Sequence, residues 1–316
     1  MAEAEVGDDG FGDDPTVRQL EEEMAELLGH EAGLFIPSGV MGNQIALRLF
    51  TRPGDQVVVA RRAHVVGYEF GAGARNAGVQ FAPLDDAAGY LQPSDVAGAL
   101  GTEGQPWPQP TMLWLEDTYM AAGGRVIPLD VLDRCIELAG SLPVHLDGAR
   151  LFNAAVAQGV APARLASRAT SVMVCLSKGL GAPVGSVLLT SAEGRAAARI
   201  ERKRLGGEMR QAGILAAAGR FALEHHVERL AQDHARAKVL AHALAERFPG
   251  SCDPATCDTN LVCAEVPDAL ARCAELRAAG VLATTLSPTT LRLTTHLDLD
   301  DRGLEQARVA IAALER

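Results

Sequence analysis

Aromatic side chains, positive charge and long apolar runs are all scarce in this sequence. Aromatic residues make up 4% of the 316 residues, which is too few for a surface on which nucleic-acid bases stack. Lysine and arginine number 29 against 40 acidic residues, and the net charge of −11 repels nucleic acid and anionic lipid. Apolar runs such as 214–218 are far shorter than the roughly 18 residues that a membrane helix requires. We therefore expect neither nucleic acid nor a membrane as a partner.

Paired cysteines are also lacking. The six cysteines are scattered, with no CxxC spacing and no histidine at zinc-ligand spacing beside them, so they predict neither a zinc site nor a redox pair. Six carboxylates stand among the first fourteen residues, where a secretory signal would need a basic start and an apolar stretch. Reduced thiols and the lack of a signal predict a cytoplasmic protein, and we expect no metal site.

Short apolar runs alternate with helix-like stretches through the first two thirds of the chain. The sequence predicts helix starts at Ser38, Pro93 and Pro128. The alternation predicts an α/β fold, with a mostly parallel seven-stranded sheet covered by helices on both faces. The runs are bounded by turn residues and lie at 33–36, 56–59, 79–82, 112–115, 143–146, 172–176 and 185–190.

The last third is organised differently. Residues 191–248 are almost entirely helical in pattern, with alanine-rich periodicity through 214–223 and 231–247. After a turn at 248–250, two helices alternate with strand-like segments at 260–264, 281–286 and 291–295. We expect a large domain over residues 1–235 and a small C-terminal α/β domain over residues 236–316.

Three polar residues, Glu116, Asp147 and Lys178, stand where predicted strands end. Ligands of open α/β sheets bind outside the carboxyl ends of the strands, so these residues are the first candidates for a site. Lys178 precedes the glycines of 179–181 and suits a desolvated amine that forms a Schiff base, although an isolated strand-end lysine is more often a plain surface residue. Asp147 could keep a pyridine nitrogen protonated, or it could cap a helix or pair with Arg150.

Two further segments have the chemistry of a ligand site. Neither of the two common nucleotide-binding motifs fits the sequence. A P-loop needs its lysine after the glycines, but Lys178 precedes them, and Val184 stands where a dinucleotide fingerprint needs glycine. Residues 37–43 instead turn from a strand into a helix whose free amides could bind an anion, although a plain helix cap has the same pattern. His64 begins another predicted helix and could lie over a planar ring, move protons, or be structural.

Together and in this order, these segments resemble the low-specificity L-threonine aldolases, which are pyridoxal-phosphate-dependent enzymes of fold type I in the beta-eliminating lyase superfamily. The strings around Asp147 and Lys178 are the most specific. The resemblance implies a large cofactor domain, a small C-terminal domain, and a homotetramer with active sites at a subunit interface. The matching stretches are 6–9, 14–17, 37–43, 64, 68–69, 145–153, 175–185 and 209–215.

The resemblance also implies roles for individual residues. Lys178 would form the Schiff base with pyridoxal 5'-phosphate, Asp147 would pair with the pyridinium nitrogen, and His64 would stack on the ring. The implied phosphate ligands are the backbone amides of Gly39 and Val40, with charge from Lys203 and Arg210, and the implied substrate-binding residues are Arg150, Arg292 and Tyr119. The implied reaction is retro-aldol cleavage of L-threonine, L-allo-threonine or a related β-hydroxy-α-amino acid to glycine and an aldehyde. His64, or water near it, would take the hydroxyl proton.

Several positions depart from the family pattern. Tyr119 stands where relatives have histidine, Glu208 where they have glycine, and Phe11 where they usually have tyrosine. Relatives also carry a segment before the match at 6–9 that supplies a serine near the substrate carboxylate, so we expect either a truncated start or weaker substrate binding. Two alternatives stay open, namely a related β-eliminating lyase and a catalytically degraded homologue that keeps the cofactor. Ammonia with a keto acid would indicate the lyase, and bound cofactor without turnover the degraded homologue.

Overall fold

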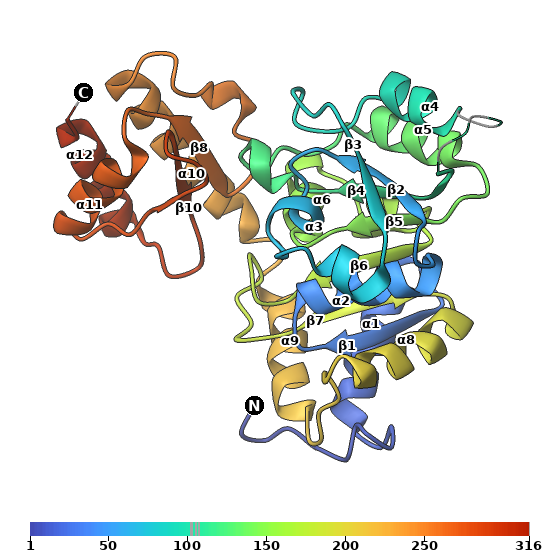
Figure 1. The fold of residues 1–316 in the computed structure, drawn as a ribbon. Coiled ribbons are helices and arrows are strands. Elements are labelled where there is room, and N and C mark those ends of the chain that lie inside the picture. The colour runs from blue at the N-terminus through green and yellow to red at the C-terminus, as the bar shows by residue number, and fades with distance from the viewer. Residues whose placement is uncertain (102–103, 105, 107, 316) are drawn as a thin grey trace.

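A seven-stranded sheet forms the centre of the molecule in the computed structural model, which describes residues 1–101, 104, 106 and 108–315 (Figure 1). The strand order is β1-β7-β6-β5-β4-β2-β3. The neighbouring strands β3, β2, β4, β5 and β6 are parallel to one another. Strand β7 is antiparallel to both β6 and β1. The mostly parallel seven-stranded sheet that the sequence predicts is thus confirmed. The strands are β1 Ala32–Ile36, β2 Gln56–Ala60, β3 Gln80–Leu84, β4 Pro110–Glu116, β5 Val144–Asp147, β6 Ser171–Cys175 and β7 Ser186–Thr190.

Helices cover both faces of this sheet. Side chains alternate along a strand, so Leu34 and Ile36 of β1 pack with Ile45 and Ala198 on the side of α2 and α8, whereas Phe35 packs in the larger core on the other side. The sheet is therefore the middle layer of three, as the apolar runs predict. The helices are α1 Pro15–Leu28, α2 Gly39–Phe50, α3 His64–Gly67, α4 Pro93–Leu100, α5 Leu129–Ala139, α6 Leu151–Gln158, α7 Pro162–Ala166, α8 Ala192–Arg204 and α9 Gly213–His225, with the short turns η1 Gly73–Ala77 and η2 Met120–Ala122.

A second, three-stranded antiparallel sheet lies to one side with its own apolar core (Figure 1). Helix α10, Leu230–Arg247, contacts both α6 and the small sheet. The predicted division after residue 235 falls inside this helix and stays a prediction. The remaining elements are β8 Leu261–Glu265, β9 Thr284–Thr285, β10 Thr290–Thr294, α11 Ala269–Ala278, α12 Asp301–Ala313 and η3 Pro254–Thr256.

Two details differ from the sequence prediction. The strand expected at 281–286 is reduced to the two residues of β9, an edge strand that pairs only with β10, and Leu282 before it is exposed. The helical stretch expected at 191–248 is interrupted between α8 and α9, where Gly206 adopts a positive φ of 76° and ends the helix. Among the described helices, none is long and apolar enough to cross a membrane.

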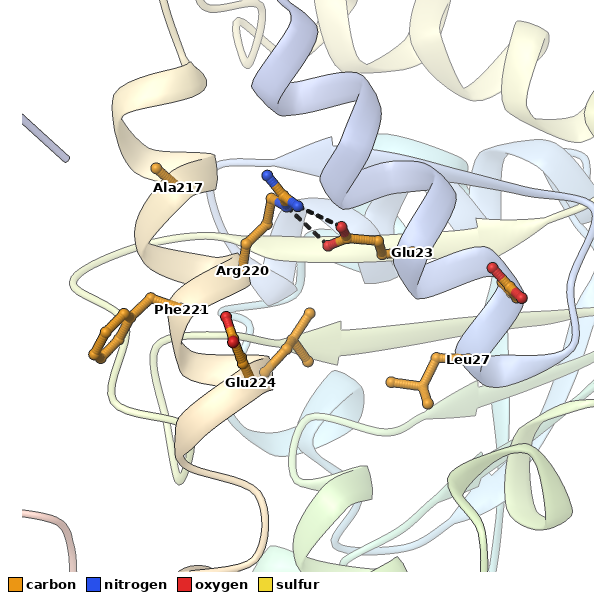
Figure 2. Close-up of a pocket in the computed structure, with 8 residues that line it drawn as sticks. Glu23, Leu27, Ala217, Arg220, Phe221 and Glu224 are labelled. Carbon is orange, nitrogen blue, oxygen red and sulfur yellow. Dashed lines mark hydrogen bonds and ion pairs between the residues drawn. The ribbon is translucent and has the colours of Figure 1, made fainter. Parts of the chain in front are cut away.

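A groove of about 860 Å³ lies between α1 and α9, away from the carboxyl ends of the parallel strands. In Figure 2, Arg220 of α9 reaches Glu23 of α1, an ion pair that crosses the groove. Leu27 and Phe221 are 41% and 56% exposed there. The residues that line the groove include none of the predicted site residues.

Candidate active site

The parallel strands bring the predicted strand-end residues to one edge of the sheet. Glu116 at the end of β4 is directly paired in register with Asp147 at the end of β5. Strand β6 is the next neighbour, and Lys178 follows it by three residues. The sequence prediction that these three positions share one edge is confirmed, and the site can be built around them.

Asp147 is held by a buried polar network. Its Oδ2 accepts a hydrogen bond from Asn43 Nδ2 at 2.8 Å, and its Oδ1 accepts one from the Ala149 amide at 3.1 Å. Asn43 donates its other amide hydrogen to Glu69 Oε1 at 2.8 Å. The Asn43 amide therefore lies between two carboxylates and reduces their repulsion, and it gives Asp147 a hydrogen-bond partner at 2% exposure.

His64 begins helix α3 and faces the same network. Its Nδ1 lies 3.0 Å from Glu69 Oε1, and its ring stacks on Tyr68 with centroids 5.6 Å apart. Burial lowers the pKa of His64, but the hydrogen bond to Glu69 and the charges of Asp147, Glu69 and Glu116 outweigh it and raise this pKa above its usual value of 6.5. Since a carboxylate only accepts, Nδ1 carries the hydrogen, and in the neutral ring Nε2 presents a lone pair.

The same residues could be considered for a metal ion, because ligand atoms of His64, Glu69 and Asp147 lie within 4.8 Å of one another. The two carboxylates, however, already accept amide hydrogens from Asn43. A cation between them would face these N–H donors.

Helix α2 points its first turn at this edge. Ser38 caps the helix, and within the described chain the hydrogen bonds of the turn come from the amides of Met41 and Gly42 to Ser38. The amides of Gly39 and Val40 are left for an acceptor such as a phosphate. A side chain at residue 39 has no room, since a Cβ there would lie 2.8 Å from Cys175 Sγ.

Lys203 and Arg210, the two cations expected near the phosphate, do not point at the start of α2. Lys203 lies in the last turn of α8 and Arg210 in the loop that follows, and this loop packs on the start of α2, because a Cβ at Gly207 would lie 2.1 Å from Met41 Sδ. Lys203, however, pairs with Glu208 at 2.8 Å, and Arg210 pairs with Asp8 at 2.7 Å. Their side chains are 69% and 64% exposed, so they point away from the buried network.

Lys178 is half-buried in the loop after β6. Within the described part of the chain its amine makes no hydrogen bond and no ion pair. Its positive charge is felt by the neighbouring thiol of Cys175, where it opposes the larger effect of burial on the thiol pKa. An amine without a partner beside a buried carboxylate network is available for covalent chemistry.

Arg150 and Arg292 form a second positively charged feature. Among the described residues no carboxylate pairs with either guanidinium. Arg150 Nε is buried without a hydrogen-bond partner, and Arg292 donates to Thr284 Oγ1 at 3.0 Å. Burial lowers the pKa of Arg150 to about 10, and the charge of Arg292 contributes in the same direction. Two unpaired like charges close together are typical of a carboxylate-binding site.

Tyr119 is almost completely buried. Its hydroxyl donates to Asp86 and accepts a hydrogen bond from the Arg62 amide at 3.1 Å. Burial and the Asp86 carboxylate both raise the pKa of Tyr119 strongly. The hydroxyl is thus engaged within the protein rather than turned toward the arginines.

The sequence reasoning missed the residues that hold the site together. Asn43, Glu69 and His145 were given no role, and Glu116 was noted only for its position. His145 Nε2 lies 3.3 Å from Asn43 Oδ1, and its Nδ1 lies 2.7 Å from Ser171 Oγ. Asn43 and Glu69 do lie in the segments that carry the family resemblance, and this was the available signal.

Comparison with known proteins agrees with this geometry. The family model described as beta-eliminating lyase matches residues 1–268. The chain is 39% identical over 311 residues to the low specificity L-threonine aldolase of Escherichia coli K12, covering 97% of this chain and 91% of that protein. It is 39% identical over 274 residues to low-specificity L-threonine aldolase 1 of Arabidopsis thaliana, covering 85% and 76%.

A solved structure of Leishmania major threonine aldolase has the same fold, with a TM-score of 0.81 and 21% identity over 95% of this chain and 90% of that one. The sequence matches and the fold lead to one assignment. The chain belongs to the beta-eliminating lyase family, among the relatives of the low-specificity L-threonine aldolases.

Proposed function

We propose that this protein is a pyridoxal-phosphate-dependent carbon–carbon lyase that cleaves L-threonine, L-allo-threonine or a related β-hydroxy-α-amino acid to glycine and an aldehyde. The observation that carries the proposal is the common location at one edge of the sheet of Asp147 at the end of β5, Lys178 three residues after β6, and the buried network that includes His64. Arg150 and Arg292 have no carboxylate partner among the described residues. The names of the most similar relatives support the same reaction class.

The described residues fit the cofactor. The unpartnered amine of Lys178 would hold it covalently, and Asp147, held in place by the Asn43 hydrogen bond, would pair with the ring nitrogen. The free amides of Gly39 and Val40 would accept the phosphate at the start of α2. Lys203 and Arg210 would add charge from a neighbouring subunit, since their side chains are 69% and 64% exposed and point away from the buried network of their own chain.

The chain's own residues supply binding and proton transfer. Pyridoxal phosphate, when bound, supplies an electron sink for the carbon–carbon bond that breaks. Arg150 and Arg292 would hold the substrate carboxylate. A direct role for Tyr119 in binding the substrate stays a prediction, and its hydroxyl donates to Asp86. His64 Nε2, or water near it, would take the proton of the β-hydroxyl, while Glu69 stabilises the resulting imidazolium.

The product identity tests the proposal. The cofactor-loaded enzyme is given L-threonine, and glycine and acetaldehyde are quantified together with ammonia. Equal amounts of glycine and acetaldehyde are expected, and His64→Asn should reduce the rate by about two or more orders of magnitude. Release of ammonia with a keto acid, or no turnover of any β-hydroxy amino acid, would contradict the aldolase assignment.

We also propose that the protein is a cytoplasmic homotetramer. Six free cysteines agree with a reducing compartment. The groove between α1 and α9 supports association with a second copy, because Phe221 projects from its rim and the groove has room for an aromatic ring of that copy in an isologous contact.

Light scattering would test the tetramer and this contact. Phe221→Asp should lower the molecular mass of the assembly, whereas Val309→Asp on α12, a residue of nearly equal exposure, should leave it unchanged. A mass of one subunit for the wild-type protein would contradict the tetramer. An unchanged mass for Phe221→Asp would exclude the groove as an interface.

A further inference from the structure

Glu116 is a buried carboxylate with two backbone partners from different segments. It ends strand β4 and is 7% exposed. Its Oε2 accepts the His64 amide at 2.7 Å, and its Oε1 accepts the Met120 amide at 3.0 Å. One side chain therefore fixes the start of helix α3 and the short turn η2, which are 52 and 4 residues away in sequence.

These two segments carry opposite sides of the site. The amide that binds Oε2 belongs to the residue whose imidazole faces Glu69. The amide that binds Oε1 belongs to Met120, whose sulfur lies 3.6 Å from a guanidinium nitrogen of Arg292. Arg292 comes from β10 of the small sheet, so the Met120 contact reaches across to the second domain.

We propose that Glu116 is a positioning residue that fixes the imidazole of His64 and the guanidinium of Arg292 relative to each other. It acts through two backbone amides and one methionine contact. The inference deepens the proposed function, on which it rests, because these two groups would bind opposite ends of one amino-acid substrate. A spacing error of about 1 Å between such groups is enough to cost a large part of the rate.

Glu116 also acts on His64 through its charge. Its carboxylate is one of the groups that raise the pKa of the imidazole. Burial, followed by the charge of Asp147, raises the pKa of Glu116 itself to about 7, so part of this effect is lost as Glu116 becomes protonated. The titratable and charged groups that influence one or both of these residues are Tyr68, Glu69, Asp117, Tyr119, Asp147 and Arg150.

Two variants separate the charge of Glu116 from its geometry. Glu116→Gln removes the charge and turns an amide group toward one of the two backbone donors, so one hydrogen bond is lost. Glu116→Asp keeps the charge but is too short to reach both amides. Asp117→Asn is the matched control, because Asp117 is the adjacent buried carboxyl and, among the described residues, its side chain accepts the Ile127 amide alone, at 3.2 Å.

The first readout is the titration of His64 followed by NMR in the protein without cofactor, with the signal assigned by a His64→Gln variant. The pKa of His64 should fall in Glu116→Gln, and stay close to the wild-type value in Glu116→Asp and in Asp117→Asn. The second readout is the dissociation constant of glycine from the cofactor-loaded protein. It should rise about tenfold in both Glu116 variants and not in the control.

Unchanged glycine binding in folded Glu116→Asp would overturn the positioning role, as would an equal loss in Asp117→Asn. If Glu116→Gln does not fold, glycine binding by the Glu116→Asp variant still tests the positioning role. A wild-type protein that binds glycine but cleaves no β-hydroxy amino acid would defeat the proposed function and leave the titration result standing, so the two failures can be distinguished.

Discussion

Gly39→Ala is expected to destabilise the protein and weaken its phosphate site. The added methyl group would lie 2.8 Å from Cys175 Sγ and 3.0 Å from Met173 Cε, in a position enclosed by the sheet. Forcing extra volume into such a packed position costs about 1–3 kcal/mol. The start of α2 must shift to relieve the contact, and the amides of Gly39 and Val40 shift with it.

The assay is urea unfolding of the protein without cofactor, together with titration of pyridoxal phosphate. Gly98→Ala is the matched control, because a Cβ at this glycine of α4 meets nothing within 4 Å. Alanine there should raise the free energy of unfolding by up to about 1 kcal/mol, since glycine is the poorer helix former. Cys175→Ala combined with Gly39→Ala should recover part of the loss.

Equal stability of Gly39→Ala and the wild-type protein would refute the packing argument. A destabilised variant that binds pyridoxal phosphate with unchanged affinity would refute the link between this packing and the phosphate site. The double variant tests whether the contact with the Cys175 thiol is the source of the strain. If it recovers nothing, the strain does not come from the contact with the thiol.

Three further variants test other parts of the account. Arg292→Ala should raise the KM for the amino acid at least tenfold and change cofactor affinity little, and equal losses would contradict its carboxylate role. Tyr119→Phe leaves Asp86 without one buried partner and should lower the free energy of unfolding by about 1–3 kcal/mol in a urea titration, so unchanged stability would count against that bond. Burial lowers the pKa of His145 to about 4 from 6.5. The unfolded chain binds the extra proton between these values, so stability should fall as pH drops from 6.5 toward 4. His145→Gln should flatten this fall, and an unchanged slope would contradict the assignment.

The sheet and the strand-end residues could be predicted because both are local signals. An apolar run ends where its strand ends, so Glu116, Asp147 and Lys178 mark the edge without knowledge of the fold. The helix starts at Ser38 and Pro93 are predicted from equally local signals, a capping serine and a proline in the first turn.

The polar network could not be predicted from local pattern. Asn43 reaches Glu69 and Asp147 across 26 and 104 residues of sequence, and only the assembled fold gives these distances. The same reason applies to Tyr119, whose partner Asp86 is 33 residues away. Strand β9 was overestimated because an apolar run does not reveal that its outer edge stays unpaired.

The attachment of the cofactor to Lys178 is the central claim, and the sequence makes it directly measurable. The chain has three lysines, Lys178, Lys203 and Lys238. Only Lys178 is half-buried at the sheet edge, while the other two are exposed. The cofactor-loaded protein is reduced with borohydride, digested and mapped by mass spectrometry. We expect the phosphopyridoxyl group on Lys178, with none on the other lysines at equimolar cofactor. Its attachment to Lys203 or Lys238, or to no lysine, would contradict the assignment of Lys178.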